Sequence, residues 1–317
     1  MSLKITQNEI DTKNMSNEEW LKQRQNSIGG SDAGAILGFN KYESPYSLYC
    51  KKVYPETFEE DLSNNEAIHF GNVLEDIVAK EFTARTGKKV RKHNKMMYHP
   101  EHEFMSANVD RVVIGEKAIL ECKTANQYKE SEWKDGNVPA SYMAQCYHYL
   151  AVTGLEKAYI AVLIGGQKFV WTEIERDEGI IDEIIESEKD FWFNHVMKQV
   201  PPETDDSEAT SDALNKLWGV TNENILTIDE EQNARFKAMI AIDKQIKELQ
   251  KEKRGHQNKL KELLGENEQG QTYNFKATWK TQRRTSLDTK RLKAERPELY
   301  EQYKTESESR PLKISEL

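Results

Sequence analysis

Short apolar runs separated by glycine-containing turns mark the N-terminal part of the chain and predict a β-sheet. Residues 107–114 and 117–123 predict two strands, and Gly115-Glu116 between them suits a two-residue type II′ turn. Residues 157–164 and 169–174 predict a second pair of strands. Both strands of the first pair contain continuous apolar runs, which are typical of strands that are covered on both faces.

Segments with helical periodicity alternate with these strands. Residues 17–24 predict a helix that begins with a capping box formed by Ser16 and Glu19. Residues 70–82 predict a longer helix with one buried apolar stripe. The side chains expected in this stripe are Phe70, Leu74, Ile77, Val78 and Phe82.

Two further helices complete the pattern of the core. Residues 139–152 predict a helix that Pro139 opens and Gly154 ends. Residues 180–192 predict an amphipathic helix that precedes a pair of prolines. Strands that alternate with helices in this way predict an α/β fold, in which helices flank a mixed central sheet.

The C-terminal part of the chain has a different pattern. Residues 229–264 predict one long charged helix, which is either a helical hairpin arm or a short coiled coil. Its apolar residues are spaced by threes and fours, and Lys253 and His256 interrupt them: Phe236, Met239, Ile240, Ile246, Leu249, Leu260 and Leu263. Residues 273–279 predict a half-buried strand with a basic outer face. We therefore expect a flexible tail, an α/β core, a linker and a C-terminal arm, at residues 1–15, 16–202, 203–228 and 229–317.

Composition narrows the class of protein. The chain has 317 residues and a formal net charge of −9. Its three cysteines, Cys50, Cys122 and Cys146, show no CxxC spacing, which favours reduced thiols and a cytoplasmic location. No apolar run approaches the ~20 residues of a membrane span, and the N-terminus has no apolar signal segment. We therefore expect no contact with a membrane.

The distribution of charge is more informative than its sum. Residues 82–100 contain six basic residues and no acid, and residues 271–297 contain eight basic residues and two acids. Basic patches on an acidic protein can follow a phosphate backbone while the protein stays soluble. The alternative is that each run is an ordinary solvated surface.

Two carboxylates and an ammonium group are predicted to meet at one end of the first strand pair. The register that the turn imposes places Asp110 opposite Glu121, on the same face of the sheet. Lys123 shares this face because it lies two residues beyond Glu121, whereas Cys122 points away. Hard cations such as Mg²⁺ bind to carboxylates arranged in this way. The alternative is that these charges are simply solvated, but the apolar runs beside them favour a functional site.

A second candidate site lies near the N-terminal end of the core. Gly29-Gly30-Ser31-Asp32 predicts a tight turn into a helix, and the start of a helix attracts anions. No Walker-type Gly-Lys-Ser/Thr sequence follows this turn, and we find no other nucleotide-binding fingerprint, which favours an activity without ATP.

Five motif pieces, in this order, resemble the YqaJ-type viral recombinase family, whose members are related to lambda exonuclease within the PD-(D/E)xK nucleases. They are Arg24 with Ile28-Gly29-Gly30-Ser31-Asp32, Gly71-Asn72-Val73-Leu74-Glu75, Asn108-Val109-Asp110, Leu120-Glu121-Cys122-Lys123 and Tyr142-Met143-Ala144-Gln145. The resemblance implies a restriction-endonuclease-like core with a helical and β-stranded C-terminal extension.

The resemblance also implies roles for the residues of the carboxylate cluster. Asp110 and Glu121 would be the principal Mg²⁺ ligands, together with the backbone carbonyl oxygen of Cys122, and Mn²⁺ is an alternative metal. Glu75 would help to hold a second metal ion or position water. Lys123 would orient the attacking water or stabilise charge on the phosphate.

Other motif residues would bind the end of the DNA. Arg24, Ser31 and Gln145 match positions that grip a 5′-phosphate in lambda exonuclease. Asn108 departs from the serine found there, which leaves the strength of this grip open. The C-terminal extension has no counterpart in lambda exonuclease, and its role is not implied.

The implied function is Mg²⁺-dependent 5′→3′ exonuclease activity on linear double-stranded DNA. It would be encoded by a phage or prophage and leave 3′ single strands for a RecT-type annealing protein in the bacterial cytosol. A trimeric ring is implied by the resemblance only. The alternatives are an endonuclease or single-strand nuclease of the same fold, or a DNA-binding scaffold without catalytic activity.

Overall fold

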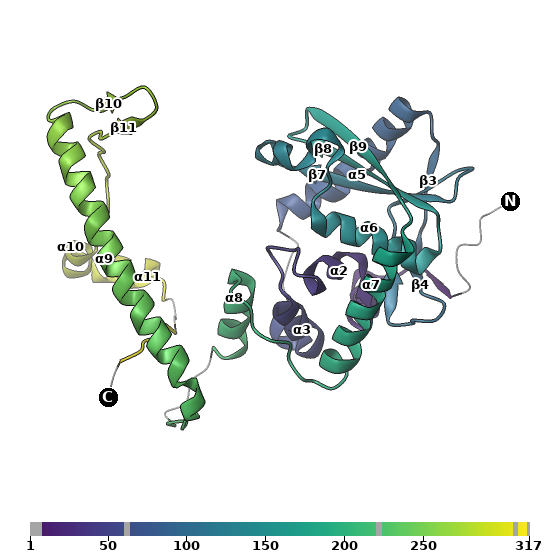
Figure 1. Ribbon diagram of the computed structural model, residues 1–317, viewed down its shortest axis with the longest axis horizontal. Helices are drawn as coiled ribbons and strands as arrows, with labels where there is room; N and C mark the ends of the chain where they lie inside the picture. The colour runs from purple at the N-terminus through teal and green to yellow at the C-terminus, as the bar shows by residue number, and fades with distance from the viewer. Residues whose placement is uncertain (1–7, 60–63, 220–223, 307–309, 316–317) are drawn as a thin grey trace. The chain divides into compact units, whose positions relative to one another are not determined.

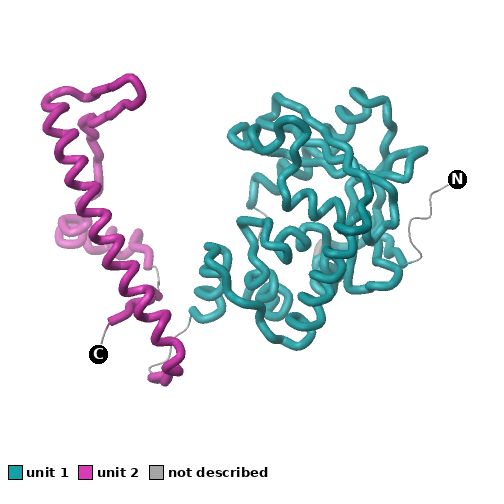
Figure 2. Tube along the Cα trace, viewed as in Figure 1, with its two compact units in different colours: residues 1–219 teal, residues 220–317 magenta. Residues whose placement is uncertain are grey.

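The computed structural model of the protein describes residues 8–59, 64–219, 224–306 and 310–315. They form two compact units, Met1–Gly219 and Val220–Leu317 (Figure 2). The boundary between the units falls inside the predicted linker. In the described part of the chain, no helix is both long enough and apolar enough to cross a membrane.

The first unit is built around a mixed sheet (Figure 1). β7 (Ala118–Ala125) and β8 (Lys157–Ile164) are parallel at its centre, and the other neighbouring strands are antiparallel. The strand order is β3-β6-β7-β8-β9, where β3 is Val90–Lys92, β6 is Arg111–Val113 and β9 is Lys168–Glu175. A mixed sheet flanked by helices was predicted, and both strands of the second predicted pair are confirmed.

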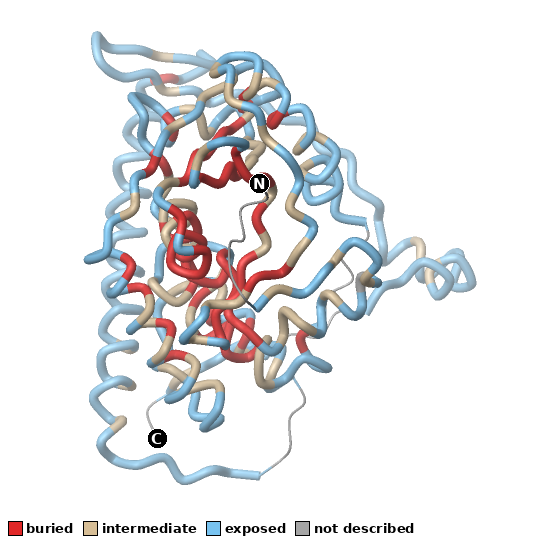
Figure 3. The backbone as a smooth tube through the Cα atoms, turned by 90° about the vertical axis from the view of Figure 1, so that its right-hand side faces the viewer, coloured by how far each residue is buried: buried red, intermediate tan, exposed pale blue. Residues whose placement is uncertain are grey.

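The side chains of β7 alternate between two helical layers. Ala118 and Leu120 pack with residues of α5 (Glu66–Thr86), whereas Ile119 belongs to the larger cluster that includes α6 (Ala140–Thr153). Cys122 packs on the α5 side, as the alternation predicts. Figure 3 colours the buried residues of the chain red. The core therefore occupies both faces of the sheet.

The predicted stripe on α5 is only partly correct. Val78 and Phe82 are buried against the sheet, but Phe70 and Ile77 are about half exposed. The reason is that α5 begins at Glu66 and only its C-terminal half lies over the sheet. Helical periodicity identified the helix but not the length over which it is covered.

A smaller sheet adjoins the core in the strand order β1-β4-β5-β2. Its strands are β1 (Glu9–Asp11), β2 (Ile28–Gly29), β4 (Lys95–Tyr98) and β5 (Met105–Ala107). Because β1 pairs with β4, the prediction of a flexible tail over residues 1–15 is wrong for this strand; residues 1–7 lie outside the described residues. The predicted strand 107–114 is also interrupted, since Ala107 ends β5 and β6 begins at Arg111 in the other sheet.

The helices of the first unit confirm several sequence signals. They are α1 (Asn17–Gln25), α2 (Gly30–Ile36), α3 (Pro45–Val53), α4 (Pro55–Phe58), η1 (Gln127–Gly136), α7 (Glu178–Asp190), η2 (Phe191–Val196) and α8 (Glu208–Leu217). The Ser16–Glu19 capping box is present on α1. The predicted linker is wrong over α8, because Thr210 and Ala213 are buried and the Thr210 hydroxyl lies 2.7 Å from that of Ser44.

The second unit consists mainly of α9 (Asn233–Leu264), which confirms the predicted long helix. Its other elements are η3 (Glu230–Gln232), β10 (Gln269–Gln271), β11 (Lys276–Thr278), α10 (Thr289–Glu295) and α11 (Pro297–Tyr303). The prediction of a half-buried strand over residues 273–279 is wrong. The strand is short, and its neighbours Tyr273 and Phe275 are exposed because its partner β10 supplies no apolar layer to cover them.

A fully buried ion pair joins α6 to α7. His148 Nδ1 lies 2.8 Å from Glu188 Oε1, and His148 Nε2 donates to the backbone oxygen of Ser106 at 2.9 Å. Burial opposes a charge on His148, but the carboxylate of Glu188 outweighs it and raises the histidine pKa. Burial also raises the pKa of Glu188. The pair therefore retains one shared proton that an unfolded chain would release.

We expect this pair to make the stability of the protein fall as the pH rises above 6.5, the ordinary pKa of histidine. The folded pair holds its proton in that range while the unfolded histidine does not, so folding is favoured less at higher pH. Glu188→Gln keeps a hydrogen-bond partner for Nδ1 but removes the carboxylate that raises the histidine pKa, so the variant has no shared proton to lose. Thermal melts of this variant should be flat above pH 6.5, whereas the surface control Glu186→Gln should follow the wild type. Equal slopes in all three proteins would contradict the shared proton.

Candidate active site

Asp110 lies where the chain leaves the smaller sheet and enters the larger one. Its Oδ2 accepts a hydrogen bond of 2.7 Å from the backbone N–H of Cys122 on β7. Val112 pairs with Ile119 in the β6–β7 hairpin, which is the register that the turn predicts. The carboxylate of Asp110 is therefore fastened beside Glu121, although Asp110 itself is outside the strand.

Glu121 is buried and holds two donors on one oxygen. Its Oε1 accepts from Lys123 Nζ at 2.6 Å and from Gln145 Nε2 at 2.8 Å. Its Oε2 is buried and has no hydrogen-bond partner among the described residues. Lys123 Nζ also lies 4.9 Å from the centre of the Tyr142 ring, which favours the charged ammonium.

The electrostatics of this cluster are those of two crowded acids and one base. Burial, and then the charge of Glu121, raise the pKa of Asp110 well above its usual value. Burial opposes the charge on Lys123, but Glu121 and Asp110 outweigh it and raise the lysine pKa. Lys123 is therefore a fixed positive charge, and the two carboxylates attract any further cation.

Glu75 comes to the same end of the sheet from α5, but a buried arginine holds it. Arg111 Nη1 donates to Glu75 Oε1 and, at 2.6 Å, to the backbone oxygen of Asp110. Its Nη2 donates to Asp76 at 2.5 Å. The charge of Glu75 still acts on Asp110 and contributes to its raised pKa. Sequence reasoning missed Arg111, although a charged residue inside a buried apolar run was the available signal.

The residues present fit a divalent cation at Asp110 and Glu121. Two observations support this. The buried Oε2 of Glu121 accepts no hydrogen bond from a described residue, and burial and the charge of Glu121 raise the pKa of the neighbouring Asp110. In the described part of the chain, no group of three or more His, Cys, Asp and Glu side chains is arranged to hold a metal. Glu75 and the backbone carbonyl of Cys122 thus remain predicted ligands.

The second candidate site lies at the start of α2. Arg24 Nη2 donates to Ser31 Oγ at 2.8 Å, and the guanidinium lies 4.9 Å from the centre of the Trp20 ring. Asp32 accepts from the backbone N–H of Gly29 at 3.1 Å and pairs with the buried Lys52 at 2.9 Å. Asp32 therefore places a carboxylate at the helix start, where Lys52 neutralises it, and anion binding by the helix start stays a prediction. Arg24 and Ser31 remain as donors.

Tyr149 and Gln145 connect the two sites. Gln145 Nε2 donates to Tyr149 Oη at 2.9 Å as well as to Glu121. Burial and the charge of Glu121 raise the pKa of Tyr149, and the positive charge of Arg24 opposes this shift. Charges from both sites therefore act on the pKa of the Tyr149 phenol. Asn108, by contrast, is partly exposed, and the structure shows no hydrogen bond from it to any described residue.

Glycine allows the two helices that carry these residues to touch. A Cβ atom added to Gly30 would lie 2.4 Å from the ring of Tyr149, and one added to Gly34 would lie 3.1 Å from Ser141 Cα. Gly30 and Gly34 are therefore explained by the close approach of α2 to α6. Sequence reasoning assigned Gly30 to a turn.

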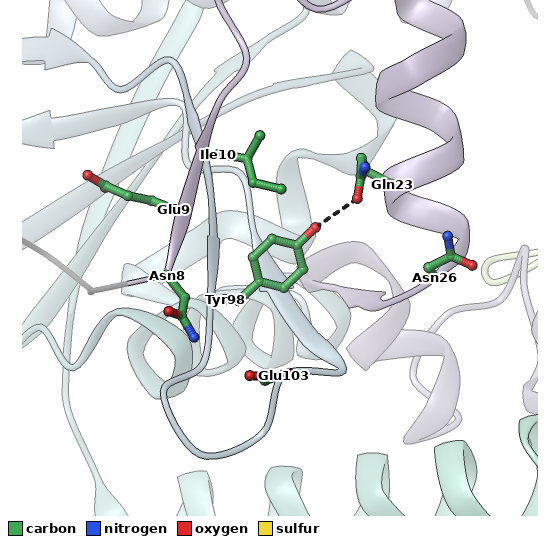
Figure 4. A pocket seen from close by; sticks show the side chains of 7 residues that line it. All are labelled: Asn8, Glu9, Ile10, Gln23, Asn26, Tyr98 and Glu103. Carbon is green, nitrogen blue, oxygen red and sulfur yellow. Dashed lines mark hydrogen bonds between the residues drawn. The ribbon is translucent and has the colours of Figure 1, made fainter.

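The basic run at residues 82–100 is largely neutralised within the protein. Arg85, Lys88, Lys92 and Lys95 each form an ion pair, with Glu81, Glu116, Asp76 and Glu9 respectively. A separate hollow of about 600 Å³ contains none of the predicted site residues (Figure 4). There the hydroxyl of Tyr98 donates to Gln23 at 3.3 Å. Neither feature adds a chemical group to the carboxylate cluster.

Comparison with solved structures defines the class of the first unit. It has the fold of an alkaline exonuclease from Laribacter hongkongensis, with a TM-score of 0.50 and 21% identity over 58% of this chain and 94% of that one. The complex of that enzyme with dAMP matches over the same shares, at a TM-score of 0.50 and 23% identity.

Comparison of sequences identifies the family. Residues 19–156 match the model of the YqaJ-like viral recombinase domain. The chain is also 44% identical over 306 residues to the uncharacterized protein YqaJ of Bacillus subtilis (strain 168), covering 96% of this chain and 95% of that protein. This protein belongs to the YqaJ-like viral recombinase family.

Substitution of Gly30 tests the contact between α2 and α6. We expect Gly30→Ala to lower the free energy of unfolding by about 1–3 kcal/mol, because the new methyl group overlaps the Tyr149 ring. Gly71→Ala is the matched control, since a Cβ there meets nothing within 4 Å and alanine favours the helix by up to ~1 kcal/mol. Urea unfolding measures both. A neutral Gly30→Ala would show that the helices are not in close contact.

Binding of Mg²⁺ can be measured without any activity. We expect Mg²⁺ to raise the melting temperature, since a ligand at a hundredfold of its Kd stabilises by about 2.7 kcal/mol. Asp110→Asn should remove this shift. In EDTA this variant should melt above the wild type, because it removes one of two like charges that are buried beside each other. The surface control Asp182→Asn should behave as the wild type does. A full Mg²⁺ shift in Asp110→Asn would exclude Asp110 as a ligand.

Proposed function

We propose that this protein is a Mg²⁺-dependent exonuclease that degrades linear double-stranded DNA from its 5′ ends. The observation that carries the proposal is the continuity of two sites. Arg24 and Ser31 present donors for an anion, and Tyr149 and Gln145 lead from them to Glu121. A terminal phosphate and the next phosphodiester could therefore be held by one surface.

The chain's own groups have distinct tasks in this reaction. Asp110 and Glu121 would hold the metal ion, which when bound supplies a Lewis acid and lowers the pKa of water. Lys123 cannot take a proton from water, because its neighbours keep it charged. Its task is to stabilise the negative charge that develops on the phosphate. Gln145 orients Glu121 through their hydrogen bond.

The anion site accounts for direction. A 5′-phosphate carries more negative charge than an internal phosphodiester, so a guanidinium beside a hydroxyl favours the end of a strand. Each cleavage would create a new 5′-phosphate for Arg24 and Ser31, which supports repeated cleavage along one strand. The remaining 3′ single strand suits a RecT-type annealing protein, and a trimeric ring around the DNA remains part of the proposal.

The relatives support this assignment. The structural neighbour from Laribacter hongkongensis is an alkaline exonuclease, and the family is described as viral recombinases. A nuclease that prepares single strands for recombination fits both descriptions. A DNA-binding scaffold would have no need for a charged lysine on Glu121.

Removal of Arg24 tests the 5′-phosphate site. We expect Arg24→Ala to slow digestion of 5′-phosphorylated linear duplexes by about 10–100-fold, because a charge-assisted hydrogen bond is worth about 1.5–3 kcal/mol. The same variant should digest 5′-hydroxyl ends at the wild-type rate, and Lys22→Ala on the same helix serves as the control. Equal losses on both kinds of end would count against the assignment of Arg24.

Removal of Lys123 or Glu121 tests the chemical step. We expect Lys123→Ala and Glu121→Ala to reduce digestion by at least about 100-fold and to leave DNA binding intact, because Lys123 would stabilise the reacting phosphate and Glu121 would hold the metal ion. Fluorescence anisotropy measures binding to the duplex, and release of acid-soluble nucleotides measures digestion. Lys117→Ala, an exposed lysine that precedes β7, is the control. Mg²⁺-dependent digestion by either variant near the wild-type rate would refute these roles.

A further inference from the structure

The helix α9 presents an apolar stripe that the other described residues of the second unit leave exposed. The side chains and their exposed fractions are Met239 43%, Ile242 53%, Ile246 45%, Leu249 64%, Leu260 50% and Leu263 81%. Among the residues of α9, Leu264 alone is buried. The helix has 32 residues and is therefore about 48 Å long.

Such a stripe requires a partner. Full burial of one large aliphatic side chain is worth about 1.5–3 kcal/mol, so a partner that covers several of them stabilises the assembly. The stripe also has the wrong geometry for a globular core. Its positions alternate by three and four residues from Met239 to Leu263, which is the a/d seam of a coiled coil.

Two polar residues interrupt the seam at its centre. With Met239 at an a position, Lys253 is also an a residue and His256 is a d residue. In a parallel pair, a residues face a residues, so Lys253 would meet the same lysine of the partner. Two ammonium groups in one buried layer repel each other. The flanking e and g positions of a parallel pair would also bring no opposite charges together.

An antiparallel pair resolves these conflicts, because its a residues face d residues. We propose that α9 pairs with α9 of a second copy of this chain as an antiparallel coiled coil, in the register that places Lys253 opposite the partner's His256. Leu249 then faces the partner's Leu260, and Ile246 faces the partner's Leu263. Twofold symmetry repeats the contact of Lys253 with the partner's His256, so the polar groups share the two central layers, and apolar side chains meet apolar side chains on both sides of them.

Charge complementarity selects the same register independently. Glu252 and Lys259 both occupy g positions, which flank each other in an antiparallel pair. The register above places Glu252 beside the partner's Lys259, and twofold symmetry repeats this contact. A shift by one heptad that lengthens the overlap would instead put Lys253 against Leu249 and His256 against Ile246. The overlap runs over residues 246–263, about 27 Å of helix.

Disulfide trapping in the full chain tests the pairing locally, whatever other contacts the protein makes. We expect an equal mixture of Leu249→Cys and Leu260→Cys chains to form a mixed disulfide dimer under mild oxidation. Each variant alone should yield no more dimer than the wild type, which contains only its native cysteines. A dimer of Leu249→Cys with itself would show parallel pairing and overturn the proposal. No dimer in the mixture would show that something else covers the stripe, which also overturns it.

A charge swap in the same cysteine variants provides a second measurement. Glu252→Lys, introduced into both chains, should weaken formation of the mixed disulfide about tenfold, because two attractive contacts become repulsive. Lys259→Glu should do the same. The double variant with both changes should return to within about twofold of the parent. Lys251→Glu, which lies on the opposite face of the helix, is the control. Failure of the double variant to recover would contradict the register.

Discussion

The confinement of two carboxylates, Asp110 and Glu121, at one end of a buried sheet is the constraint that organises the first unit. Burial and the charge of Glu121 both oppose a charge on Asp110. Three donors stabilise the two carboxylates through hydrogen bonds: the ammonium of Lys123, the amide of Gln145 and the backbone N–H of Cys122. Cys122 and Lys123 come from β7, Gln145 comes from α6 and Asp110 lies at the crossing between the two sheets, so all three parts must be in place before the cluster can exist.

Contacts on two sides of α6 fix its position. Gly30 and Gly34 let α2 approach until it contacts Tyr149 and Ser141, and the buried pair of His148 and Glu188 ties the other side of α6 to α7. Small residues on one side and a hydrogen-bonded ion pair on the other leave the helix little freedom to slide. Gln145 is consequently held at hydrogen-bond distance from Glu121, and Tyr149 is held between the carboxylates and Arg24.

Local rules predicted the features that depend on neighbours in sequence. The Ser16–Glu19 capping box, the end of α6 at Gly154 and the pairing of Val112 with Ile119 follow from spacing alone. Features that depend on distant residues were not predictable. The break before Arg111 occurs because the chain changes sheets, and the exposure of Phe70 and Ile77 depends on where the sheet ends.

The carboxylate cluster shows both kinds of outcome. Asp110, Glu121 and Lys123 were expected together because strand alternation places them so. The capping of α2 by Asp32 was not expected, because the preference of Asp32 for the N–H of Gly29 and for Lys52 depends on α3. The proposed anion site consequently has the side-chain donors Arg24 and Ser31 beside a helix start whose carboxylate is paired with Lys52.

The arrangement of Glu75 has a consequence for how the cluster can bind metal. Lys123 and Arg111 are cations supplied by the protein, and they hold one oxygen of Glu121 and one of Glu75. A divalent ion that used only Asp110 and the second oxygen of Glu121 would leave both pairs intact. An ion that also used Glu75 would have to compete with a buried guanidinium, which also contacts Asp76 and the backbone of Asp110. Loss of such a buried partner is costly, so a first metal ion at Asp110 and Glu121 should bind more tightly than a second at Glu75.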